Sequence, residues 1–467
     1  MTESNQLLQS DRYRAAKQEL LQAILESGRK ISAVRAPSQD AGAREKYQAL
    51  MQDFQAHRGR ELNYPFVSSG LGSGPFVELM DGSVKYDMIT GIGINFFGHA
   101  HPELIAEVID GLPSDIMQGN LQSGVEAYAL LKELMKHVGA GSRLKHAWFA
   151  TCGTMANELA LKIIRQKNAP ATKLFAFTDC FAGRSTAMQE VTDNPKYREG
   201  QPTYGEVYHL PFYSEKLGVE ASAQATISFM THFTDRFPGK FAGMMIELVQ
   251  GEGGFNYAPR DYYVRVFEAA KKLGLAIWAD EIQTFGRTGE LFAYQTFGLN
   301  EYIDVVTVAK ALQAGVVMFA ADYNPKPGLI AGTFTGSVSG LRTGRRVLEL
   351  LTQGGYFGPT GKVARSSDRF VKHLEMLAAG SCKGKISDIR RIGGMIAFQP
   401  YSGTMDEVKS LLTRLFDLGC VAFYCGHGPY LVRLLPPLGA MEEKHIDEVC
   451  ELIEKAVLAA PQSPGGA

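Results

Sequence analysis

The sequence predicts an α/β protein built around a mostly parallel β-sheet. From about Val125 to Gly340, segments with apolar residues at helical spacing alternate with short segments that are apolar almost throughout. This alternation is typical of strand–helix–strand units, in which strands buried on both faces are continuously apolar. Each apolar segment ends in polar residues or glycine, and open α/β sheets bind ligands beyond the carboxyl ends of their strands. The predicted strands are His146–Ala150, Lys173–Thr178, Gly243–Leu248, Ala276–Asp280 and Val305–Val308.

The size and composition indicate a soluble globular protein with two domains, or one large domain with a lobe. The chain has 467 residues, of which 45% are apolar and 21% are charged, and its formal net charge is −1. A protein with so little net charge has no excess of positive charge that would attract nucleic acid or an anionic membrane. The sequence contains neither an apolar segment of membrane-spanning length nor an apolar signal core at its start. We therefore expect a cytoplasmic protein.

The cysteines and histidines favour neither a disulfide framework nor a metal site. The six cysteines include no C-x-x-C pair, which indicates reduced thiols. His99 and His101 lie one residue apart without a carboxylate or cysteine at ligand spacing, so a turn between a strand and a helix explains them better than a metal does. We predict no bound metal.

Residues 1–60 are predicted to form a helical N-terminal extension. Narrow apolar stripes occur within Tyr13–Leu25 and Tyr47–Phe54, on either side of a loop around Pro37. Such stripes cannot form a core alone, so we expect the extension to lie over another part of the protein or over a partner subunit. Short strands follow from about Phe76, where Asp81-Gly82 predicts a hairpin turn between two alternating arms.

Two further helices and a tail complete the predicted elements. Asp261–Lys272 has apolar residues at helical spacing and is followed by Gly274, a typical helix stop. Leu341–Leu351 is predicted as a long helix that leads into a last segment of mixed strands and helices. Residues 461–467 are predicted to be a disordered tail.

The candidate chemistry is centred on an acid and a lysine that each follow a buried strand. Asp280 ends the apolar segment AIWAD, and Lys310 follows the apolar segment VVTVA. Parallel strands bring such residues to one edge of the sheet. A lysine that forms a Schiff base and an acid that keeps a pyridine nitrogen protonated are the parts required for pyridoxal phosphate chemistry.

Two turns upstream could complete such a site. In TCGTMANELALK, Gly153 and Thr154 open a helix whose free N–H groups suit a phosphate, although strand–glycine–helix turns are also common structural connections. In FTDCFAGRS, Phe181 follows a strand and could stack on a flat cofactor, or could be an ordinary core residue. Arg184 in the same loop could hold a carboxylate, or could be a surface arginine.

Three other charged residues adjoin buried strands. Glu247 and Glu252 bracket a glycine-flanked loop, and a carboxylate there either pairs structurally or contacts a cation in the site. Arg433 lies within the apolar segment YLVRLL, where a guanidinium needs a carboxylate partner from the protein or from a substrate.

The order of these features resembles that of class III aminotransferases, a group of fold-type I pyridoxal phosphate enzymes. The resemblance covers about residues 60–455, and its most specific motif is DEIQTFGRTG with the downstream Ala-Lys. It implies a large domain at 105–340 with a mostly parallel sheet. It also implies a smaller α/β domain formed by 61–104 and 341–460. The resemblance is strongest to the 4-aminobutyrate, lysine 6- and ornithine aminotransferases.

The resemblance implies a role for each candidate residue. Asp280 and Lys310 would be the catalytic pair, while Phe181 would stack on the ring and Gln283 would lie beside its phenolic oxygen. Gly153 and Thr154 would bind the phosphate, to which Thr333 of a partner subunit would also contribute. Arg433 would hold an α-carboxylate with Glu252 as its switch, and Arg184 would hold the far carboxylate of the substrate.

The sequence departs from the family pattern near the substrate. Phe181-Ala182-Gly183-Arg184 replaces an aromatic-His-Gly-Arg motif, and DEIQTFGRTG lacks one glycine of the usual form. Met155 stands where the family has glutamate before Ala-Asn-Glu, and Val338 stands where GGNP-like loops have proline. The positions that would bind the cofactor are retained.

The sequence therefore predicts a homodimeric, pyridoxal-phosphate-dependent aminotransferase. It would move an amino group, expected to be an ω-amino group, to a 2-oxo acid such as 2-oxoglutarate by a ping-pong mechanism. Two alternatives stay open. One is a racemase, epimerase or aminomutase on the same scaffold, and the other is a non-catalytic binding descendant, against which the Asp280–Lys310 pair argues.

Overall fold

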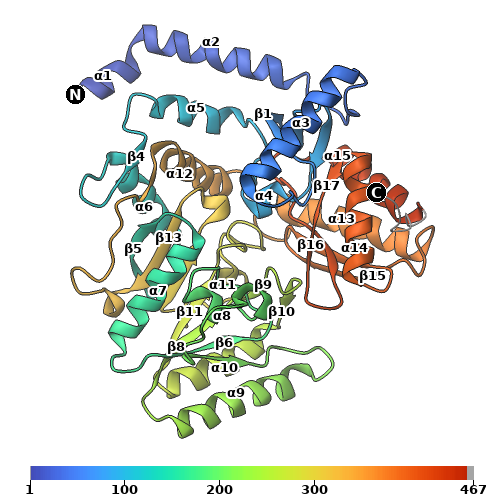
Figure 1. The fold of residues 1–467 in the computed structure, drawn as a ribbon. Helices are drawn as coiled ribbons and strands as arrows, with labels where there is room; N and C mark the ends of the chain where they lie inside the picture. The colour runs from blue at the N-terminus through green and yellow to red at the C-terminus, as the bar shows by residue number, and fades with distance from the viewer. Residues whose placement is uncertain (1, 460–467) are drawn as a thin grey trace. The chain divides into compact units, whose positions relative to one another are not determined.

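A seven-stranded mixed sheet forms the centre of one of the two compact units of the protein (Figure 1). The computed structural model describes residues 2–459. This sheet unit comprises residues 111–363 and 425–427. Its strand order is β5-β13-β12-β11-β8-β6-β7. Only β13 runs antiparallel to its neighbours, so the sheet is mostly parallel, as predicted. The strands are β5 (Leu144–Ala150), β6 (Lys173–Phe177), β7 (Val207–Leu210), β8 (Phe241–Ile246), β11 (Ala276–Asp280), β12 (Val305–Val308) and β13 (Gly315–Ala320).

The central strands form because their side chains are apolar on both faces. Every residue of β8, β11 and β12 is buried. Trp278, in the middle of β11, is fully buried and donates a hydrogen bond from Nε1 to Thr307 Oγ1 on β12 at 3.1 Å. The five predicted strands are all present, and all five begin and end within two residues of the predicted limits. The strands β7 and β13 were not predicted.

The helices of this unit follow the strands as predicted for strand–helix–strand units. The predicted helix at 261–272 is α10 (Arg260–Lys272), and the predicted helix at 341–351 lies within α12. The helix α7 (Gly153–Lys167) packs against β5, β12 and β13, and α9 (Gly218–Arg236) packs against α10 (Figure 1). The other helices are α6 (Val125–Lys136), α7 (Gly153–Lys167), α8 (Met188–Val191), α9 (Gly218–Arg236), α11 (Ala293–Thr296) and α12 (Val338–Gln353), with 3-10 turns η1 (Pro195–Arg198), η2 (Lys310–Leu312) and η3 (Ala321–Tyr323). Two ribbons pair β9 (Val249–Gln250) with β10 (Asn256–Tyr257) and β4 (Met117–Gln118) with β14 (Gly336–Ser337).

The second unit combines both ends of the chain, residues 1–110 with 364–424 and the segment from Gly428 onward. One four-stranded sheet has the order β1-β2-β3-β17 and the other has the order β15-β16-β19-β18. The hairpin predicted at Asp81-Gly82 joins β2 to β3, and Gly82 has a left-handed φ of 78°. The strands are β1 (Ser68–Ser73), β2 (Phe76–Leu79), β3 (Val84–Asp87), β15 (Ile386–Ile392), β16 (Met395–Pro400), β17 (Cys420–Val421), β18 (Phe423–Cys425) and β19 (Leu431–Leu434). The helices are α1 (Glu3–Gln9), α2 (Asp11–Gly28), α3 (Ala41–Arg58), α4 (Thr90–Gly93), α5 (Pro102–Gly111), α13 (Lys362–Ala379), α14 (Met405–Leu418) and α15 (Glu443–Leu458).

The compact units divide the chain after residues 110 and 363, whereas the predicted domains divide it after residues 104 and 340. The difference concerns α12, which packs against α6 and η2 and therefore belongs to the sheet unit. The domain boundaries themselves stay a prediction. The predicted tail at 461–467 lies outside the described residues.

The N-terminal extension is helical over α1, α2 and α3, and α2 is attached to α5 by polar contacts. Tyr13 donates a hydrogen bond to the carbonyl of Ile109 at 2.7 Å, and Lys17 pairs with Asp110 at 2.7 Å. Leu20, in the apolar stripe of α2, is 44% exposed. Within residues 2–459, no helix is long and apolar enough to cross a membrane.

A buried carboxylate connects the sheet to its flanking elements. Asp304 is fully buried and accepts the backbone N–H of Ile277 at 2.8 Å. It also pairs with Lys271 of α10 and with Arg143, each at 2.5 Å. Two cations and a backbone donor therefore share one buried anion, whose loss would leave all three without this partner.

We predict that Asp304→Ala lowers the free energy of unfolding by about 3 kcal/mol, because the N–H of Ile277 loses its buried acceptor and Lys271 loses its ion-pair partner, while Arg143 keeps only Asp322. Urea unfolding monitored by circular dichroism measures the change. Asp322→Ala is the matched control, since Asp322 pairs with the same Arg143 at 3.4 Å but is half exposed. Its expected cost is below about 1 kcal/mol. Equal costs for the two variants would contradict the assigned role of Asp304.

Candidate active site

The candidate site lies at the carboxyl ends of two neighbouring parallel strands. Asp280 ends β11 and pairs in register with Thr307 of β12, and Lys310 begins η2 directly after that strand. Asp280 is 5% exposed. The predicted acid and the predicted lysine are therefore brought to one edge of the sheet.

Asp280 is held in place by two hydrogen bonds. Its Oδ1 atom accepts the backbone N–H of Ile282 at 2.9 Å, and its Oδ2 atom accepts from Nδ2 of Asn157 at 2.8 Å. Asn157 is fully buried on α7 and also donates to the carbonyl of Ala182 at 2.7 Å. Burial raises the pKa of Asp280, while the two hydrogen bonds and the charge of Lys310 act in the opposite direction.

Lys310 has an unusual backbone conformation. Its φ is 44°, in the left-handed region that residues with a side chain seldom adopt. The conformation belongs to the tight turn η2, which reverses the chain from β12 into the antiparallel strand β13. A strain of about 1–3 kcal/mol at such a residue typically accompanies a functional constraint.

Glu247 braces the two loops that flank Asp280. It is 6% exposed, and its two carboxylate oxygens accept the backbone N–H groups of Phe181 at 2.7 Å and Gly251 at 2.9 Å. Burial raises the pKa of Glu247, and the negative charge of Asp280 raises it further. Of the two alternatives for this carboxylate, structural pairing is observed, and the charge of Lys310 also acts on it.

Glu281 does not share the environment of Asp280. It is fully buried and accepts the backbone N–H groups of Ala293 and Tyr294 at 2.9 and 2.8 Å, together with a hydrogen bond from Thr284. Burial raises the pKa of Glu281 to about 7. Its role is to attach the start of α11 to the end of β11.

The loop that carries Phe181 approaches the start of α7 closely. Gly183 has a φ of 130°, and a Cβ atom at this position would lie 2.5 Å from Thr154 Oγ1. The Thr192 hydroxyl accepts the N–H of Ala182 at 2.9 Å and donates to the carbonyl of Gly183 at 3.0 Å. Only glycine therefore allows this loop to lie against Thr154.

The start of α7 has the features of an anion site. Cys152 at the N-cap makes no side-chain capping hydrogen bond, so side chains leave the first N–H groups of α7 uncapped. Gly153 lies so close to the loop after β11 that a Cβ atom would be 2.8 Å from Ile282 Cδ1. Phosphate suits these N–H groups and the positive end of the helix dipole.

The other predicted residues lie in different surroundings. Gln283 is 8% exposed and so close to Gly251 that a Cβ atom there would be 2.5 Å from Gln283 Nε2. The Glu252 carbonyl accepts the N–H of Gly426 at 2.8 Å. Arg184 is exposed, with its guanidinium 4.0 Å from the centre of the Tyr197 ring. 

Thr333 lies on the surface of the sheet unit, and Arg433 is buried within the other compact unit. Thr333 is exposed, and its carbonyl adjoins Gly119. Arg433 belongs to the other compact unit, where it is fully buried in β19 opposite Ala397, 5.8 Å from the centre of the Phe423 ring.

The residues around Asp280 fit pyridoxal phosphate. The buried carboxylate suits a protonated ring nitrogen, and the Oδ1 atom of the adjoining Asn157 is buried without a hydrogen-bond partner among the described residues. The start of α7 suits the phosphate, and Lys310 suits the aldehyde. Of these residues, sequence reasoning missed the role of Asn157. Its spacing to Ala160, Leu161 and Ile164 on the buried face of α7 was a usable signal, because a polar residue on an apolar stripe requires a partner.

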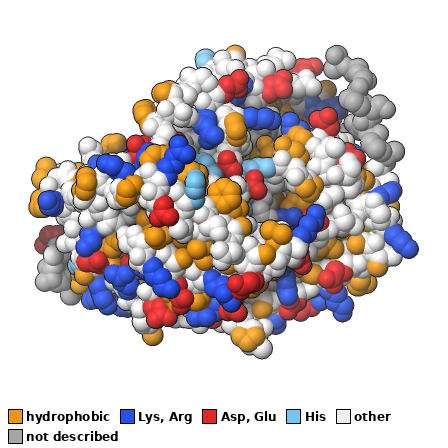
Figure 2. Space-filling view, turned by 90° about the horizontal axis from the view of Figure 1, so that it is seen from below, with side chains coloured by type: hydrophobic (Ala, Val, Ile, Leu, Met, Phe, Trp, Pro, Cys, Tyr) orange, Lys and Arg blue, Asp and Glu red, His pale blue; other side chains and the backbone are white. Residues whose placement is uncertain are grey.

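His99 pairs with a carboxylate rather than with His101. Its Nε2 atom lies 3.1 Å from Oδ2 of Asp87. Among residues 2–459, no group of three or more histidine, cysteine, aspartate or glutamate side chains is arranged to hold a metal ion. On the face in Figure 2, basic and acidic side chains are interspersed, in keeping with the net charge of −1.

An Asp–His pair adjoins the Phe181 loop. Asp179 has a left-handed φ of 63°, its N–H donates to Asp193 Oδ2 at 3.0 Å, and its Oδ1 lies 2.8 Å from His427 Nδ1. The hydrogen bond to Asp179 raises the pKa of His427. The protonated pair therefore stabilises the fold fully below the unfolded pKa of about 6.5, and this contribution disappears as the pH rises through the folded pKa.

We predict that His427 titrates above pH 6.5 and that Asp179→Asn lowers its pKa, because burial then acts without the opposing carboxylate. NMR titration of the imidazole signals, assigned with His427→Gln, measures both values. Asp322→Asn is the control and should leave the His427 signal unchanged. An unaltered pKa in Asp179→Asn would show that the pair does not form in solution.

Comparison with known proteins identifies the family. The family described as aminotransferase class-III matches residues 59–457. Acetylornithine aminotransferase of Methanocaldococcus jannaschii is 28% identical over 401 residues, covering 82% of this chain and 92% of the relative. The enzyme of the same name from Mycolicibacterium smegmatis is 30% identical over 397 residues, covering 83% and 93%.

Two solved structures share the fold. An aminotransferase of Bacillus anthracis has a TM-score of 0.79 and 19% identity, covering 90% of this chain and 99% of its own. The lysine aminotransferase from M. tuberculosis in the internal aldimine form has a TM-score of 0.77 and 21% identity, covering 87% and 98%. Since the family match spans nearly the whole chain, the protein belongs to the class III aminotransferases, pyridoxal-phosphate-dependent enzymes of fold type I that act on amino and keto acids.

Proposed function

We propose that this aminotransferase accepts the amino group of an ω-amino acid and passes it to 2-oxoglutarate in a ping-pong cycle. The observation that carries the chemistry is the buried Asp280, held by Asn157 and Ile282 at the strand edge from which Lys310 emerges. The names of the relatives, acetylornithine aminotransferase and lysine aminotransferase, support an amino group remote from the α-carbon of the donor.

Each cofactor-binding residue has a physical task in this proposal. When bound, pyridoxal phosphate supplies a ring that accepts electrons from the reacting carbon. Asp280 keeps the ring nitrogen protonated, because a buried carboxylate with two hydrogen bonds already made is stabilised further by a cation opposite it. Phe181, whose backbone N–H is held by Glu247, would cover the ring of the cofactor, and Gln283 would bind its phenolic oxygen. Gly153 and Thr154 bind the phosphate.

Lys310 performs the proton transfers at the substrate. Its amine would remove the proton from the carbon that bears the reacting nitrogen and would hold that proton until the transfer is completed. The left-handed backbone at Lys310 determines the direction in which its side chain leaves the turn. The same residue retains the cofactor between turnovers.

Substrate choice is assigned to two arginines and an acid. Arg184 is exposed on the Phe181 loop and supplies a guanidinium for the carboxylate far from the reacting carbon. Arg433 accepts the α-carboxylate of glutamate, and Glu252 neutralises that arginine when the donor lacks an α-carboxylate at the reacting end. This arrangement allows one site to accept both half-reactions of the cycle.

We predict different effects for the two substrate-binding positions. Arg184→Ala should weaken both half-reactions about tenfold or more, because each loses a charge-assisted hydrogen bond of about 1.5–3 kcal/mol. Glu252→Ala should impair the ω-amine half-reaction more than the glutamate half-reaction. Stopped-flow half-reactions with 4-aminobutyrate, lysine, N-acetylornithine and glutamate measure the four rates.

The control for Arg184 is Lys196→Ala, which removes an exposed cation from the adjoining turn η1. It should leave both half-reactions unchanged. If Arg184→Ala matches this control, the donor is not a carboxylate-bearing ω-amine. Epimerisation of an amino acid without net transfer to 2-oxoglutarate would instead favour the racemase alternative.

We also propose a homodimer in which Thr333 contributes to the neighbouring phosphate site. Thr333 is exposed next to a group of exposed apolar side chains around β4, α6 and β14. Leu121 is 96% exposed, Ile116 84% and Phe334 56%, an arrangement that soluble monomers seldom tolerate. A two-fold interface on this surface would bury these side chains and explain them.

We predict that mixing two impaired variants, assayed at limiting cofactor, restores activity. Lys310→Ala should lose almost all turnover, and Thr333→Ala should bind the cofactor more weakly. A hybrid dimer contains one site with neither substitution and one with both, so activity should exceed that of either variant alone. Sedimentation velocity checks the assembly, and Leu121→Asp should dissociate it. A fully active monomer contradicts the shared site.

A further inference from the structure

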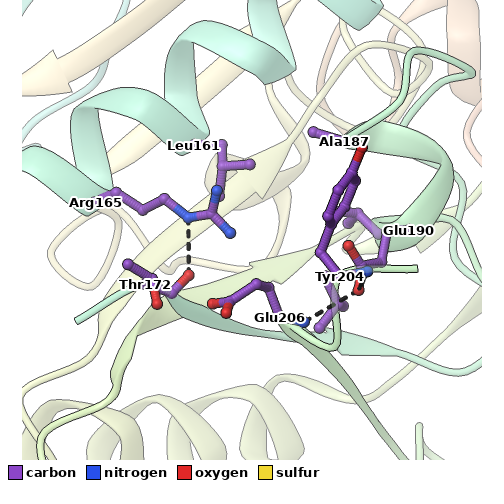
Figure 3. A pocket seen from close by; sticks show the side chains of 9 residues that line it. Leu161, Arg165, Thr172, Ala187, Glu190, Tyr204 and Glu206 are labelled. Atoms are coloured by element: carbon purple, nitrogen blue, oxygen red, sulfur yellow. Dashed lines mark hydrogen bonds between the residues drawn. The ribbon is translucent and has the colours of Figure 1, made fainter. Parts of the chain in front are cut away.

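A cavity is lined by α7, α8 and the segment before β7, and none of its lining residues is assigned to the reaction (Figure 3). Its volume is about 430 Å³, within the range of about 300–1,000 Å³ that is typical of small-molecule sites. All of its lining residues belong to the sheet unit. The walls combine one guanidinium, two carboxylates and an apolar surface.

The two carboxylates come from two parts of the lining, Glu190 from α8 and Glu206 from the segment before β7 (Figure 3). Glu190 is 8% exposed, and its Oε1 atom accepts the backbone N–H groups of Tyr204 and Glu206, each at 3.1 Å. The Oε2 atom of Glu206 is buried, and among residues 2–459 no group donates a hydrogen bond to it. The nearest cation, Lys173, is 4.0 Å from the other Glu206 oxygen and donates to the carbonyl of Gly205. The Glu206 side chain is 30% exposed and lines the cavity, so the carboxylate presents its charge there although its Oε2 atom is buried.

The guanidinium of Arg165 faces these carboxylates across the cavity. Its Nε atom donates to the carbonyl of Thr172 at 2.8 Å, and its terminal nitrogens point into the cavity (Figure 3). The fixed Nε contact orients the planar fork, which suits bidentate binding of a carboxylate. The ring of Tyr204 lies beside Glu190 in the lining, and an aromatic face attracts a ligand cation (Figure 3).

The charge pattern selects a zwitterion. The carboxylates of Glu190 and Glu206 would repel a phosphate or other dianion, whereas the guanidinium of Arg165 would repel a simple cation. A ligand with a carboxylate and an ammonium group satisfies both sides. Between them, the remaining walls are formed by the apolar side chains of Leu161, Ala187, Val191 and Val207.

The cavity is also connected to the candidate active site through one short segment. Glu190 and Val191 belong to α8, and the next residue, Thr192, makes two hydrogen bonds to the Phe181 loop. The carbonyl of Val191 accepts from the thiol of Cys180, which lies in that loop. A ligand that shifts α8 must therefore also move the loop or break these bonds.

We propose that this cavity is an effector site for a free α-amino acid with an aliphatic side chain. The ammonium group binds Glu206 and Glu190, the carboxylate binds Arg165, and the aliphatic side chain lies on the apolar wall. Binding is transmitted to the Phe181 loop through Thr192.

The test is titration calorimetry of the holoenzyme with L-leucine. Arg165→Gln and Glu206→Gln should each weaken binding about tenfold or more, because each removes one charge-assisted contact. The controls are Lys162→Gln on the exposed side of α7 and Glu199→Gln on the exposed loop before β7, which remove the same charges outside the cavity. 4-Methylpentanoate lacks the ammonium group of leucine, and 3-methylbutylamine lacks its carboxylate. Each should bind at least about tenfold more weakly than leucine does.

The results separate this cavity from the catalytic site. Binding at the catalytic site would be equal in all four variants, and that result, or the absence of any binding, overturns the proposal. Leucine should also change the apparent KM for the amino donor by about fivefold or more in the wild type and the controls, and not in the cavity variants. Leucine binding without this kinetic effect would overturn the coupling through Thr192 alone.

Discussion

The position of one buried carboxylate, Asp280, determines the arrangement of the candidate site. An ionised carboxylate in a dry interior is unstable unless hydrogen bonds and a nearby cation compensate for its lost hydration. Asn157 supplies one of these bonds from α7 and Ile282 supplies another from the loop after β11. Because Asn157 also holds the Ala182 carbonyl, the acid, the helix start and the Phe181 loop are located relative to one another by a single side chain.

A second buried acid, Glu247, holds the Phe181 loop from another side and connects it to the Gly251 loop. Glu247 binds backbone N–H groups on both the Phe181 loop and the Gly251 loop, so neither loop can move independently of β8. Loops positioned by strand ends in this way offer precise geometry although they lie outside regular structure. The active site is therefore organised by carboxylates that do not contact substrate as well as by those proposed to do so.

The sequence predicted the elements whose signals are local. The strand Ala276–Asp280 has its predicted limits because an unbroken apolar run between polar residues identifies it. The strand β13 was missed because it reverses direction after the short turn at Lys310, whereas the expected pattern requires a helix between strands. Asn157 was missed because its partner Asp280 lies 123 positions away, and the two acids 280 and 281 were indistinguishable until the structure showed that Glu281 binds the start of α11. The substrate residues depend on contacts that no local pattern encodes.

The position of Trp278 links the intrinsic fluorescence of the protein to the candidate site. The chain has only two tryptophans, and this one is fully buried two residues before Asp280 in the strand that ends at the candidate site. Two residues of a strand span about 7 Å, a separation at which an excited indole transfers its energy efficiently to a chromophore that absorbs near its emission. A cofactor bound beside Asp280 would therefore quench the emission of Trp278, and the signal that remains would come from Trp148.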